Sequence, residues 1–513
     1  MRARLASSSS GPSSPQGQTA SVSATALVGI VLAAGLGAAP HASAGALPTV
    51  KVASNESSPS KPTGPEAPED GVILQAFNWP FALVAERMRE LAALGYTHVH
   101  VSPPSLSINR TEWWARYQPI DYRVIDGPLG NEDDFARMNQ VAASLDIKIV
   151  ADLVLNHMAN PDFARYNVRY TDNPEQLYYP DPATRQRYGL SFLFGPEDFN
   201  PTGCIQNFDD RQQVLYDRLC LGFPDKGLPD LNLNRPNVVA AQRAYLQKLI
   251  ALGVDGFRVD ALKHIPPETI TTIFADIDRS RILLFGEIIA HTGNLQREIG
   301  PYIDGTDLSF YDFPLVHLMR QAFQPGGSMA VLADPAGSGL ALPGERAVTF
   351  IVNHDIPNNG DIFKYLLFHD REEERLAYSY ILGRSQGLAY VYTDLGRQDG
   401  LDTDRFFDAY ADPALVPMMG FRKAMAGQEE QILWASDQVL AWRRGNKGLV
   451  VVNKSGNDIF DLSQLKLDGL EDGLFRDVLS DRELTIAGGQ PLTTLQNQVV
   501  GPRRATMFVR SEP

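Results

Sequence analysis

Short apolar runs alternate with amphipathic stretches through most of the chain, from about residue 71 to residue 428. The amphipathic stretches carry apolar residues at steps of three and four, as at Val238, Ala241, Tyr245 and Leu249. Apolar runs that alternate with such helices are typical of parallel strands in βα units. Eight runs of this kind predict a (β/α)8 barrel, the TIM-barrel fold. The expected strands are residues 71–77, 96–101, 148–154, 254–260, 281–287, 307–310, 348–352 and 388–393.

Two segments depart from this alternation and predict additional domains. Residues 158–229, after the third strand, are rich in Pro, Asn, Asp, Tyr and Phe and have little helical periodicity. A loop of that length without structure of its own is uncommon, so we expect a small domain inserted after strand three. Residues 429–513 show alternating strands and turns, which predicts a C-terminal antiparallel β domain. The barrel then comprises residues 71–157 and 230–428.

The first 70 residues have the composition of a targeting segment followed by a tether. Two arginines precede an apolar run at Ala26–Ala39, and a small-x-small site ends at Ala44. These are the parts of a signal peptide, so we expect residues 1–44 to be removed from a secreted protein. A disordered tail rich in Ala and Ser is the alternative. Residues 45–70 are rich in Ser, Pro, Glu and Lys, which is typical of a flexible linker.

The net charge restricts the class of partner. At −15 the chain repels nucleic acid and anionic membrane surfaces, so neither is expected to bind. The apolar run near the start is too short for a typical membrane span. An uncharged polysaccharide remains a suitable ligand, and we expect a monomer.

Two cysteines, Cys204 and Cys220, occur in the chain, and both fall within the expected inserted domain. In an exported protein, such a pair is most simply a disulfide that closes a local loop. Two free thiols are the alternative. The sequence contains no Cys/His cluster with zinc spacing and no HExxH motif.

Three acidic residues, Asp260, Glu287 and Asp355, stand where expected strands meet polar loops. A carboxylate at the end of a buried strand costs stability, and the carboxyl ends of barrel strands converge on one face. Arg258 lies two residues before Asp260, on the same face, which favours the ionised form that a nucleophile needs. Apolar sequence neighbours surround Glu287 and favour the protonated form of a general acid. Converging carboxylates indicate glycoside hydrolysis.

The segments that contain these residues closely resemble the conserved regions of the α-amylase family of glycoside hydrolases, family 13. Leu228–Asn232 and Gly387–Asp394 resemble two further regions of that family. Trp113–Pro119 resembles the aromatic wall of the sugar cleft in animal-type and related bacterial α-amylases. The resemblance covers about residues 71–425 and extends less specifically to the last domain. The four main matching segments are residues 152–157, 256–264, 286–287 and 350–355.

The resemblance implies a role for each residue of the expected site. It makes Asp260 the nucleophile, Glu287 the acid/base and Asp355 the carboxylate that binds ring hydroxyls, in a retaining mechanism. It places Lys263 and His264 on the leaving-group side. Aromatic side chains suit the apolar faces of glucose rings, although a core cluster of tryptophans is the alternative. The other implied substrate-binding residues are Trp113, Trp114, Tyr117, Gln118, His157, Arg258 and His354.

The resemblance also implies a structural calcium ion between the barrel and the inserted domain. Asn156 and Asp230 match its side-chain ligands, and the carbonyl groups of Arg218 and His264 match its backbone ligands. Oxygen ligands of this kind are those that calcium prefers. The alternative is that Asn156 and Asp230 only satisfy loop amides.

Chloride is a second ion to consider, because chloride-activated members of the family hold it between two basic residues. Arg258 and Asn353 match that site, but Tyr390 stands near the second basic position. This departure argues against chloride as a cofactor.

These features predict a secreted, endo-acting α-amylase that hydrolyses internal α-1,4 bonds of starch, glycogen or maltooligosaccharides. A related α-glucan glycosyltransferase or an oligosaccharide-trimming glucosidase is the nearest alternative. Outside enzymes, the alternative is a non-catalytic carbohydrate-binding barrel, which retention of all three carboxylates disfavours.

Overall fold

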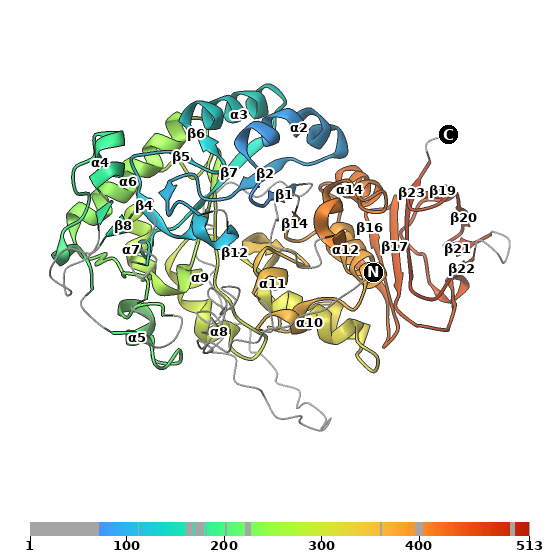
Figure 1. The fold of residues 1–513 in the computed structure, drawn as a ribbon. Helices are drawn as coiled ribbons and strands as arrows, with labels where there is room; N and C mark the ends of the chain where they lie inside the picture. Colours follow the sequence, from blue (N-terminus) through green and yellow to red (C-terminus); the bar gives the residue numbers. More distant parts are fainter. Residues whose placement is uncertain are drawn as a thin grey trace, which may run out of the picture.

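The computed structural model describes residues 71–110, 112–160, 168–169, 179–180, 182–200, 203–220, 227–359, 362–394, 404–492 and 498–511. The predicted signal peptide, residues 1–44, and the predicted linker, residues 45–70, lie outside these ranges. A closed barrel of eight parallel strands forms the centre, which confirms the predicted (β/α)8 fold (Figure 1). The barrel strands are β1 (Val72–Ala76), β2 (His98–Val101), β7 (Lys148–Leu153), β10 (Gly256–Val259), β11 (Leu283–Gly286), β12 (Ser309–Tyr311), β13 (Ala347–Thr349) and β14 (Leu388–Thr393).

Burial on both faces explains why the barrel strands are apolar in sequence. Every residue of β1 and β14 is buried, because side chains fill the barrel on one face and helices cover the other. The expected strand at residues 348–352 is shorter in the structure, where β13 ends at Thr349. The chain then turns onto the barrel face before it reaches Asp355.

The helices begin and end at residues whose side chains explain their limits. Asn131 caps α3 (Glu132–Ser144), because its side chain accepts the N–H of Asp134 at 3.0 Å while Asp134 accepts the N–H of Asn131. Gly95 ends α2 (Phe81–Leu94) in the left-handed conformation, with φ of 103°. No helix in these ranges is long and apolar enough to cross a membrane. The remaining helices of the barrel are α6 (Pro236–Ala251), α7 (Pro267–Ile273), α8 (Leu295–Glu298), α9 (Gly300–Gly305), α10 (Phe313–Phe323), α11 (Asp355–Asn358), α12 (Arg371–Gly383), α13 (Asp404–Phe407) and α14 (Leu415–Ala424).

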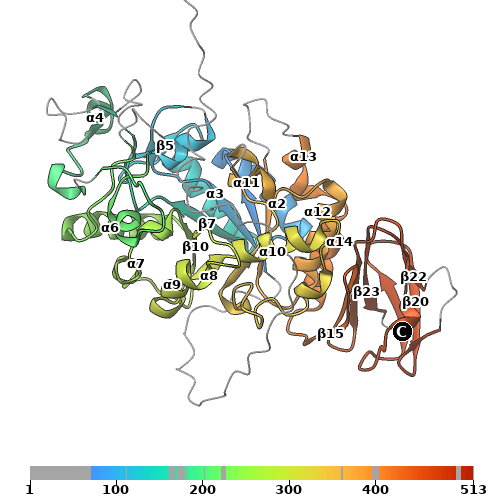
Figure 2. The same cartoon turned by 90° about the horizontal axis from the view of Figure 1, so that it is seen from below.

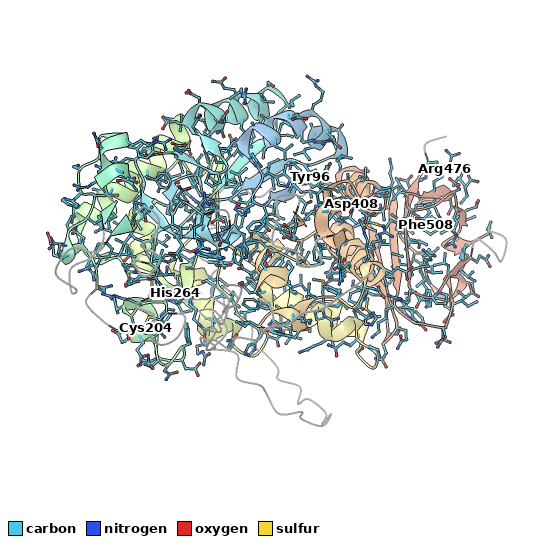
Figure 3. All side chains as sticks on the ribbon, viewed as in Figure 1. Tyr96, Cys204, His264, Asp408, Arg476 and Phe508 are labelled. Atoms are coloured by element: carbon cyan, nitrogen blue, oxygen red, sulfur yellow. A yellow bond between two sulfur atoms is a disulfide. The ribbon has the colours of Figure 1, made fainter. Side chains whose placement is uncertain are left out.

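The C-terminal domain is a seven-stranded antiparallel sheet in the order β15-β16-β17-β23-β19-β20-β21, as predicted for a β domain. Seen from below, it forms a separate layer beside α12 and α14 (Figure 2). Trp442 and Met507 face the barrel and join its apolar core, whereas Phe508 belongs to a second core on the other face. Figure 3 labels Phe508 within this sheet. The strands are β15 (Glu430–Ala435), β16 (Val439–Arg444), β17 (Gly448–Asn453), β19 (Gly473–Asp477), β20 (Glu483–Ala487), β21 (Gln490–Pro491) and β23 (Arg504–Arg510).

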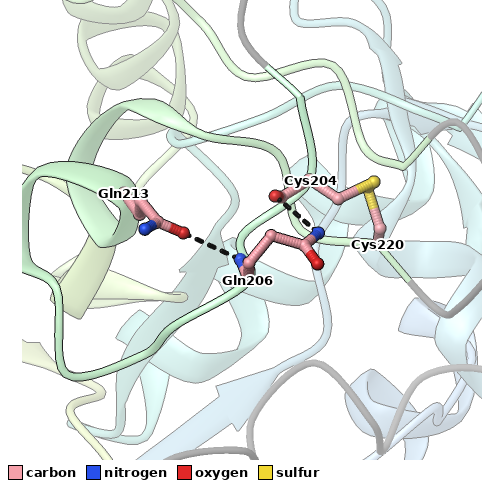
Figure 4. Close-up of a disulfide and its surroundings, with 4 residues drawn as sticks. All are labelled: Cys204, Gln206, Gln213 and Cys220. Atoms are coloured by element: carbon pink, nitrogen blue, oxygen red, sulfur yellow. Dashed lines mark hydrogen bonds between the residues drawn. A yellow bond between two sulfur atoms is a disulfide. The ribbon is translucent and has the colours of Figure 1, made fainter.

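The inserted segment is described in part, and a disulfide joins Cys204 to Cys220 within it, with Cα atoms 5.5 Å apart. This confirms the predicted pairing. Gln206 ties the bridge to α5 (Arg211–Tyr216): its side chain donates to the Cys204 carbonyl at 3.0 Å, and its N–H donates to Gln213 at 2.8 Å (Figure 4). Gly227 packs against the bridge with φ of 76°, and a Cβ there would clash with the Cys220 sulfur. The segment also contains α4 (Pro182–Tyr188) and the paired strands β8 (Val168–Arg169) and β9 (Tyr179–Pro180).

The barrel closes where β1, its first strand, pairs with β14, its last. Arg422 on α14 braces this seam from a position 351 residues after Gly71. Its buried guanidinium donates to the carbonyl oxygens of Gly71 at 3.1 Å, Ile381 at 3.2 Å and Arg384 at 3.1 Å. One side chain therefore joins the first strand, α12 and the loop that leads into β14.

Candidate active site

The predicted carboxylates gather at the C-terminal end of the barrel. Asp260 follows β10 directly and Glu287 follows β11, as expected from the sequence. Asp355 differs, because it is the first residue of α11 and lies beyond the end of β13. The Asn353 side chain makes this turn by accepting the N–H groups of Asp355 at 3.2 Å and Ile356 at 3.3 Å.

Arg258 is the centre of the cluster, and its guanidinium is fully buried. Its Nη1 donates to Asp260 Oδ1 at 2.7 Å and to Asp152 Oδ1 at 2.8 Å, while Nη2 lies 2.6 Å from Glu287 Oε1. The sequence-based interpretation paired Arg258 with Asp260 alone and gave Glu287 apolar surroundings. The pairing with Asp260 is present, but Arg258 also contacts Asp152 and Glu287, so Glu287 lies beside a cation as well as beside apolar neighbours. Residue order along a strand shows the face, but not which neighbouring strands share it.

The four acidic groups outnumber their cation, and the cluster retains protons. Burial raises the pKa of Asp260 to about 8; Arg258 opposes this, and the charges of Glu287 and Asp152 add to it. Burial also raises the pKa of Asp355 well above its usual range, assisted by the charge of Glu287 and a hydrogen bond with it. Two carboxyl groups can share a hydrogen bond only when one is protonated. The expectation that Arg258 keeps Asp260 ionised at neutral pH is therefore wrong for this site, because burial and the neighbouring carboxylates outweigh the guanidinium. The cluster as a whole holds both ionised and protonated carboxyl groups near neutral pH.

Asp152 on β7 belongs to the cluster, although the sequence analysis gave it no role. Burial alone would raise its pKa, but Arg258 and His100 outweigh burial and hold the pKa below its usual range. Tyr117 donates its hydroxyl to Asp152 Oδ2 at 2.9 Å. The signal was available in the sequence, because a carboxylate within an otherwise apolar buried strand has the same cost as one at the strand end.

His354 is held as a neutral ring beside Asp355. Gln75 on β1 donates to His354 Nδ1 at 2.8 Å, so the ring proton lies on Nε2, which is 3.6 Å from Asp355 Oδ2. Phe77 and Tyr117 stack on the imidazole, with centroid distances of 4.7 Å and 5.2 Å. Burial lowers the pKa of His354 well below its usual value, and Arg258 adds to the effect.

The aromatic segment forms the short 3-10 helix η2 (Trp113–Tyr117) and is largely buried. Trp113 is 8% exposed and packs against His354 at 5.8 Å between ring centroids. Trp114 is 5% exposed and lies under the guanidinium of Arg110. The structure thus brings Tyr117 to the Asp152 carboxylate and Trp113 to His354. Gln118 has a structural contact instead: its side-chain oxygen accepts the backbone N–H of Asn160 at 2.6 Å.

The three remaining predicted substrate residues line the boundary with the inserted segment. His157 donates Nε2–H to the Tyr117 carbonyl at 3.1 Å, and burial lowers its pKa to about 4. His264, labelled in Figure 3, is 1% exposed and donates Nδ1–H to the Val214 carbonyl of α5 at 2.7 Å. Burial lowers the pKa of His264 to about 3. Lys263 pairs with Glu298 at 3.0 Å. The His264 ring is therefore packed under the insertion.

Of the residues expected to bind calcium, Asn156 and Arg218 lie near Asp230, which pairs with His157. Asp230 is 2% exposed, accepts from Asn200 Nδ2 at 2.7 Å and also bonds the Asn156 side chain. Burial raises the pKa of Asp230 well above its usual range, while the two amides oppose this shift. Arg218 lies close enough to lower that pKa. Within the described ranges, no group of three or more His, Cys, Asp or Glu side chains is placed to hold a metal. A calcium ion here would therefore depend on amide and carbonyl oxygens together with one carboxylate, a donor set that suits it.

Comparison with known proteins agrees with this geometry. The family description "Alpha amylase, catalytic domain" matches residues 82–301, and "Alpha amylase, C-terminal all-beta domain" matches residues 434–508. An α-amylase from Aeromonas hydrophila is 42% identical over 393 residues, which are 75% of this chain and 84% of that protein.

Many solved structures share the fold, among them these two. One is a glutamate-to-glutamine mutant of α-amylase I from Eisenia fetida in complex with maltohexaose, with a TM-score of 0.67 and 21% identity over 87% of this chain and 98% of that one. The other is γ-CGTase from an alkalophilic Bacillus clarkii, with a TM-score of 0.65 and 18% identity over 87% of this chain and 70% of that one. The chain belongs to the α-amylase family and is an α-amylase-type glycoside hydrolase.

Proposed function

We propose that this protein is a retaining, endo-acting α-amylase that cleaves internal α-1,4 bonds of starch, glycogen or maltooligosaccharides. The observation that carries this proposal is the contact of Asp260 and Glu287 with the two terminal nitrogens of one guanidinium. Carboxyl groups that share one guanidinium lie close together, and retention requires a separation of only about 5–5.5 Å.

The proposed reaction has two steps. The reactive form is the one in which Asp260 is ionised and Glu287 carries a proton of the cluster. Glu287 gives this proton to the glycosidic oxygen while Asp260 attacks the anomeric carbon, so that the bond to the leaving sugar breaks and a glycosyl–Asp260 ester forms. Glu287, now ionised, takes a proton from water, and the resulting hydroxide displaces Asp260 from the sugar. Asp355 and His354 are assigned to ring hydroxyls; the support is that His354 Nε2 and Asp355 Oδ2 lie 3.6 Å apart, so both polar groups are available at one point of the site.

Substrate positioning is assigned to the residues around this centre. Trp113 and Tyr117 border the carboxylates and offer aromatic faces for glucose rings. Lys263 is proposed to bind on the leaving-group side. His157 and His264 are buried beneath the insertion, so we propose that they shape the cleft wall.

The nearest alternative differs only in the acceptor of the second step. The structural likeness to a CGTase is compatible with transfer to a sugar hydroxyl instead of water. Product analysis separates the two reactions. With soluble starch we expect rapid loss of iodine staining, linear maltooligosaccharides and initial products of α configuration. Cyclic or lengthened products would favour the transferase, and initial β products would refute retention.

We propose that a structural calcium ion binds beside Asp230. The side chains of Asn156 and Asp230 and the carbonyl groups of Arg218 and His264 would hold it. Bound there, the cation would neutralise a buried carboxylate and join the inserted segment to the barrel.

Calcium removal is expected to lower stability without any need to measure activity. A ligand that binds the native state at 100 times its Kd stabilises it by about 2.7 kcal/mol, so EDTA should lower the free energy of unfolding by a similar amount. Urea unfolding with and without calcium measures this difference. Asp230→Asn should abolish the calcium dependence, whereas Asp133→Asn, on the exposed start of α3, should preserve it. A calcium response that survives in Asp230→Asn would place the ion elsewhere.

Secretion remains part of the proposal and is supported by the leader-like composition of residues 1–44 and by the disulfide.

A further inference from the structure

Three polar side chains cross the interior of the barrel without belonging to the carboxylate cluster. Tyr311 on β12, Tyr390 on β14 and His100 on β2 are each at most 1% exposed. Branched apolar residues usually fill the interior of such barrels, and each buried polar group costs stability unless it is hydrogen-bonded. Retaining three of them in one row indicates a purpose beyond packing.

The hydrogen bonds of this row run in one direction. Tyr311 donates its hydroxyl to Tyr390 at 2.6 Å, which leaves the Tyr390 proton for His100 Nδ1 at 2.7 Å. Burial lowers the pKa of His100, which favours the neutral ring. With Tyr390 as the donor to Nδ1 and the Asp152 carboxylate facing Nε2, we infer that the single proton lies on Nε2. That nitrogen lies 3.5 Å from Asp152 Oδ2, a long polar contact inside a buried site. The row therefore presents an N–H dipole to Asp152.

Asp152 and Asp260 compete for the same nitrogen atom. Arg258 Nη1 donates to both of them, at 2.8 Å and 2.7 Å. A further donor to Asp152 weakens its demand on Nη1, so the hydrogen bond from Nη1 to Asp260 becomes stronger. The donors facing Asp152 are His100, Tyr117 and Arg258, and Asp152 in turn acts on the pKa of Asp260. Of the other charged and titratable groups nearby, Glu287 acts on His100, Arg258 and Asp260, and His354 responds to both Asp152 and Arg258. Asp355 responds to Glu287, Arg258 and Asp260.

We propose that Tyr311, Tyr390 and His100 form a positioning relay that holds Asp152 and thereby sets how Arg258 divides between Asp152 and Asp260. The relay touches neither substrate nor reacting atoms and acts through Arg258. Its effect on catalysis rests on the proposed function, because it concerns the ionisation of the proposed nucleophile.

The test is Tyr390→Phe, which removes the hydroxyl and keeps the ring. Without the Tyr390 hydroxyl, His100 loses the donor that fixes its proton on Nε2. Asp152 then depends more on its hydrogen bond from Arg258, which weakens the bond from Arg258 to Asp260. Asp260 then ionises at higher pH, so the acidic limb of the kcat/KM profile should move up by roughly 0.5–1 pH unit. We expect kcat at pH 6 to fall about three- to tenfold, with KM within about twofold of wild type.

Tyr380→Phe is the matched control. Tyr380 is also buried, and its hydroxyl donates to the Leu332 carbonyl at 3.0 Å, outside the barrel interior. The Tyr380→Phe variant should be less stable than wild type, but the acidic limb of its kcat/KM profile should not move. Tyr311→Phe supplies a second variant, with a smaller shift in the same direction. An unchanged acidic limb in Tyr390→Phe, or an equal shift in Tyr380→Phe, would overturn the relay.

A second readout does not depend on activity. Nitrogen-15 NMR of histidine-labelled protein should show His100 with a bare Nδ1 and a protonated Nε2, and Tyr390→Phe should change this pattern. A wild-type His100 protonated on Nδ1 would overturn the relay even in an active enzyme. A wild type that cleaves no α-glucan but shows the expected tautomer would refute the proposed function instead.

Discussion

Glu287→Gln is expected to reduce hydrolysis of soluble starch by roughly 10²–10⁴-fold, the range for loss of a general acid/base. The amide keeps the shape of the side chain but has no acidic proton to give to the glycosidic oxygen. It also weakens the contact with Arg258, which joins Glu287 to Asp260. Initial rates of reducing-end release measure the effect.

An activated aryl maltooligosaccharide separates the roles of the two carboxylates. Its leaving group departs without protonation, so Glu287→Gln should form the glycosyl-enzyme from it with a much smaller loss than from starch. Asp260→Asn replaces the carboxylate nucleophile with a neutral amide, so activity on starch and on the aryl substrate should fall alike. The two assignments would have to be exchanged if Glu287→Gln lost activity on starch and on the aryl substrate equally, while Asp260→Asn kept its activity on the aryl substrate.

Arg258→Met is expected to cost about 3–5 kcal/mol of unfolding free energy at pH 7, as for other buried ion pairs that lose one partner. Three buried carboxylates contact this guanidinium, and Met fills similar space without supplying charge. Arg258 lowers the folded-state pKa of Asp152 and Asp260, and its removal raises both above their values in wild type. The unfolded carboxyl groups are the same in both proteins, so the deficit should be smallest at low pH, where Asp152 is protonated in both folded proteins. It should grow as pH rises from the lowered pKa of Asp152 in wild type towards the raised pKa in Arg258→Met.

Urea unfolding of wild type and Arg258→Met between pH 4 and pH 8 measures this dependence. Arg476→Met provides the control, because Arg476 is 66% exposed and pairs with an exposed Glu483. Surface pairs contribute about 0–1 kcal/mol, so its effect should be small and nearly independent of pH. A deficit in Arg258→Met that did not change with pH would show that lost packing, rather than lost charge, causes it.

The sequence predicted the barrel well because its local signals agree with its packing. The expected limits of β14 match the structure, since burial on both faces makes the strand apolar. The sequence predicted that the preceding strand ends at residue 352, whereas β13 ends at Thr349. The apolar residues beyond Thr349 remain buried after the strand ends, so hydropathy alone could not locate the boundary.

The site could be predicted residue by residue but not contact by contact. Asp260 and Glu287 lie where strand ends suggested, whereas the sharing of Arg258 with Asp152 depends on the register of three neighbouring strands. The burial of His264 depends on where the inserted segment folds back, which residue spacing does not specify. Long-range packing therefore determined what local sequence pattern could not.

The brace at Arg422 has a consequence for how the chain acquires its structure. The strand that begins the barrel has no final neighbour on one edge until β14 and α14 exist, about 350 residues later. At a synthesis rate of roughly 5–20 residues per second, that edge stays open for some tens of seconds. During this time β1 presents unpaired backbone to any other strand, which is the usual route to aggregation. A chaperone that shields the emerging barrel should therefore raise the yield of active protein more than one that acts after release.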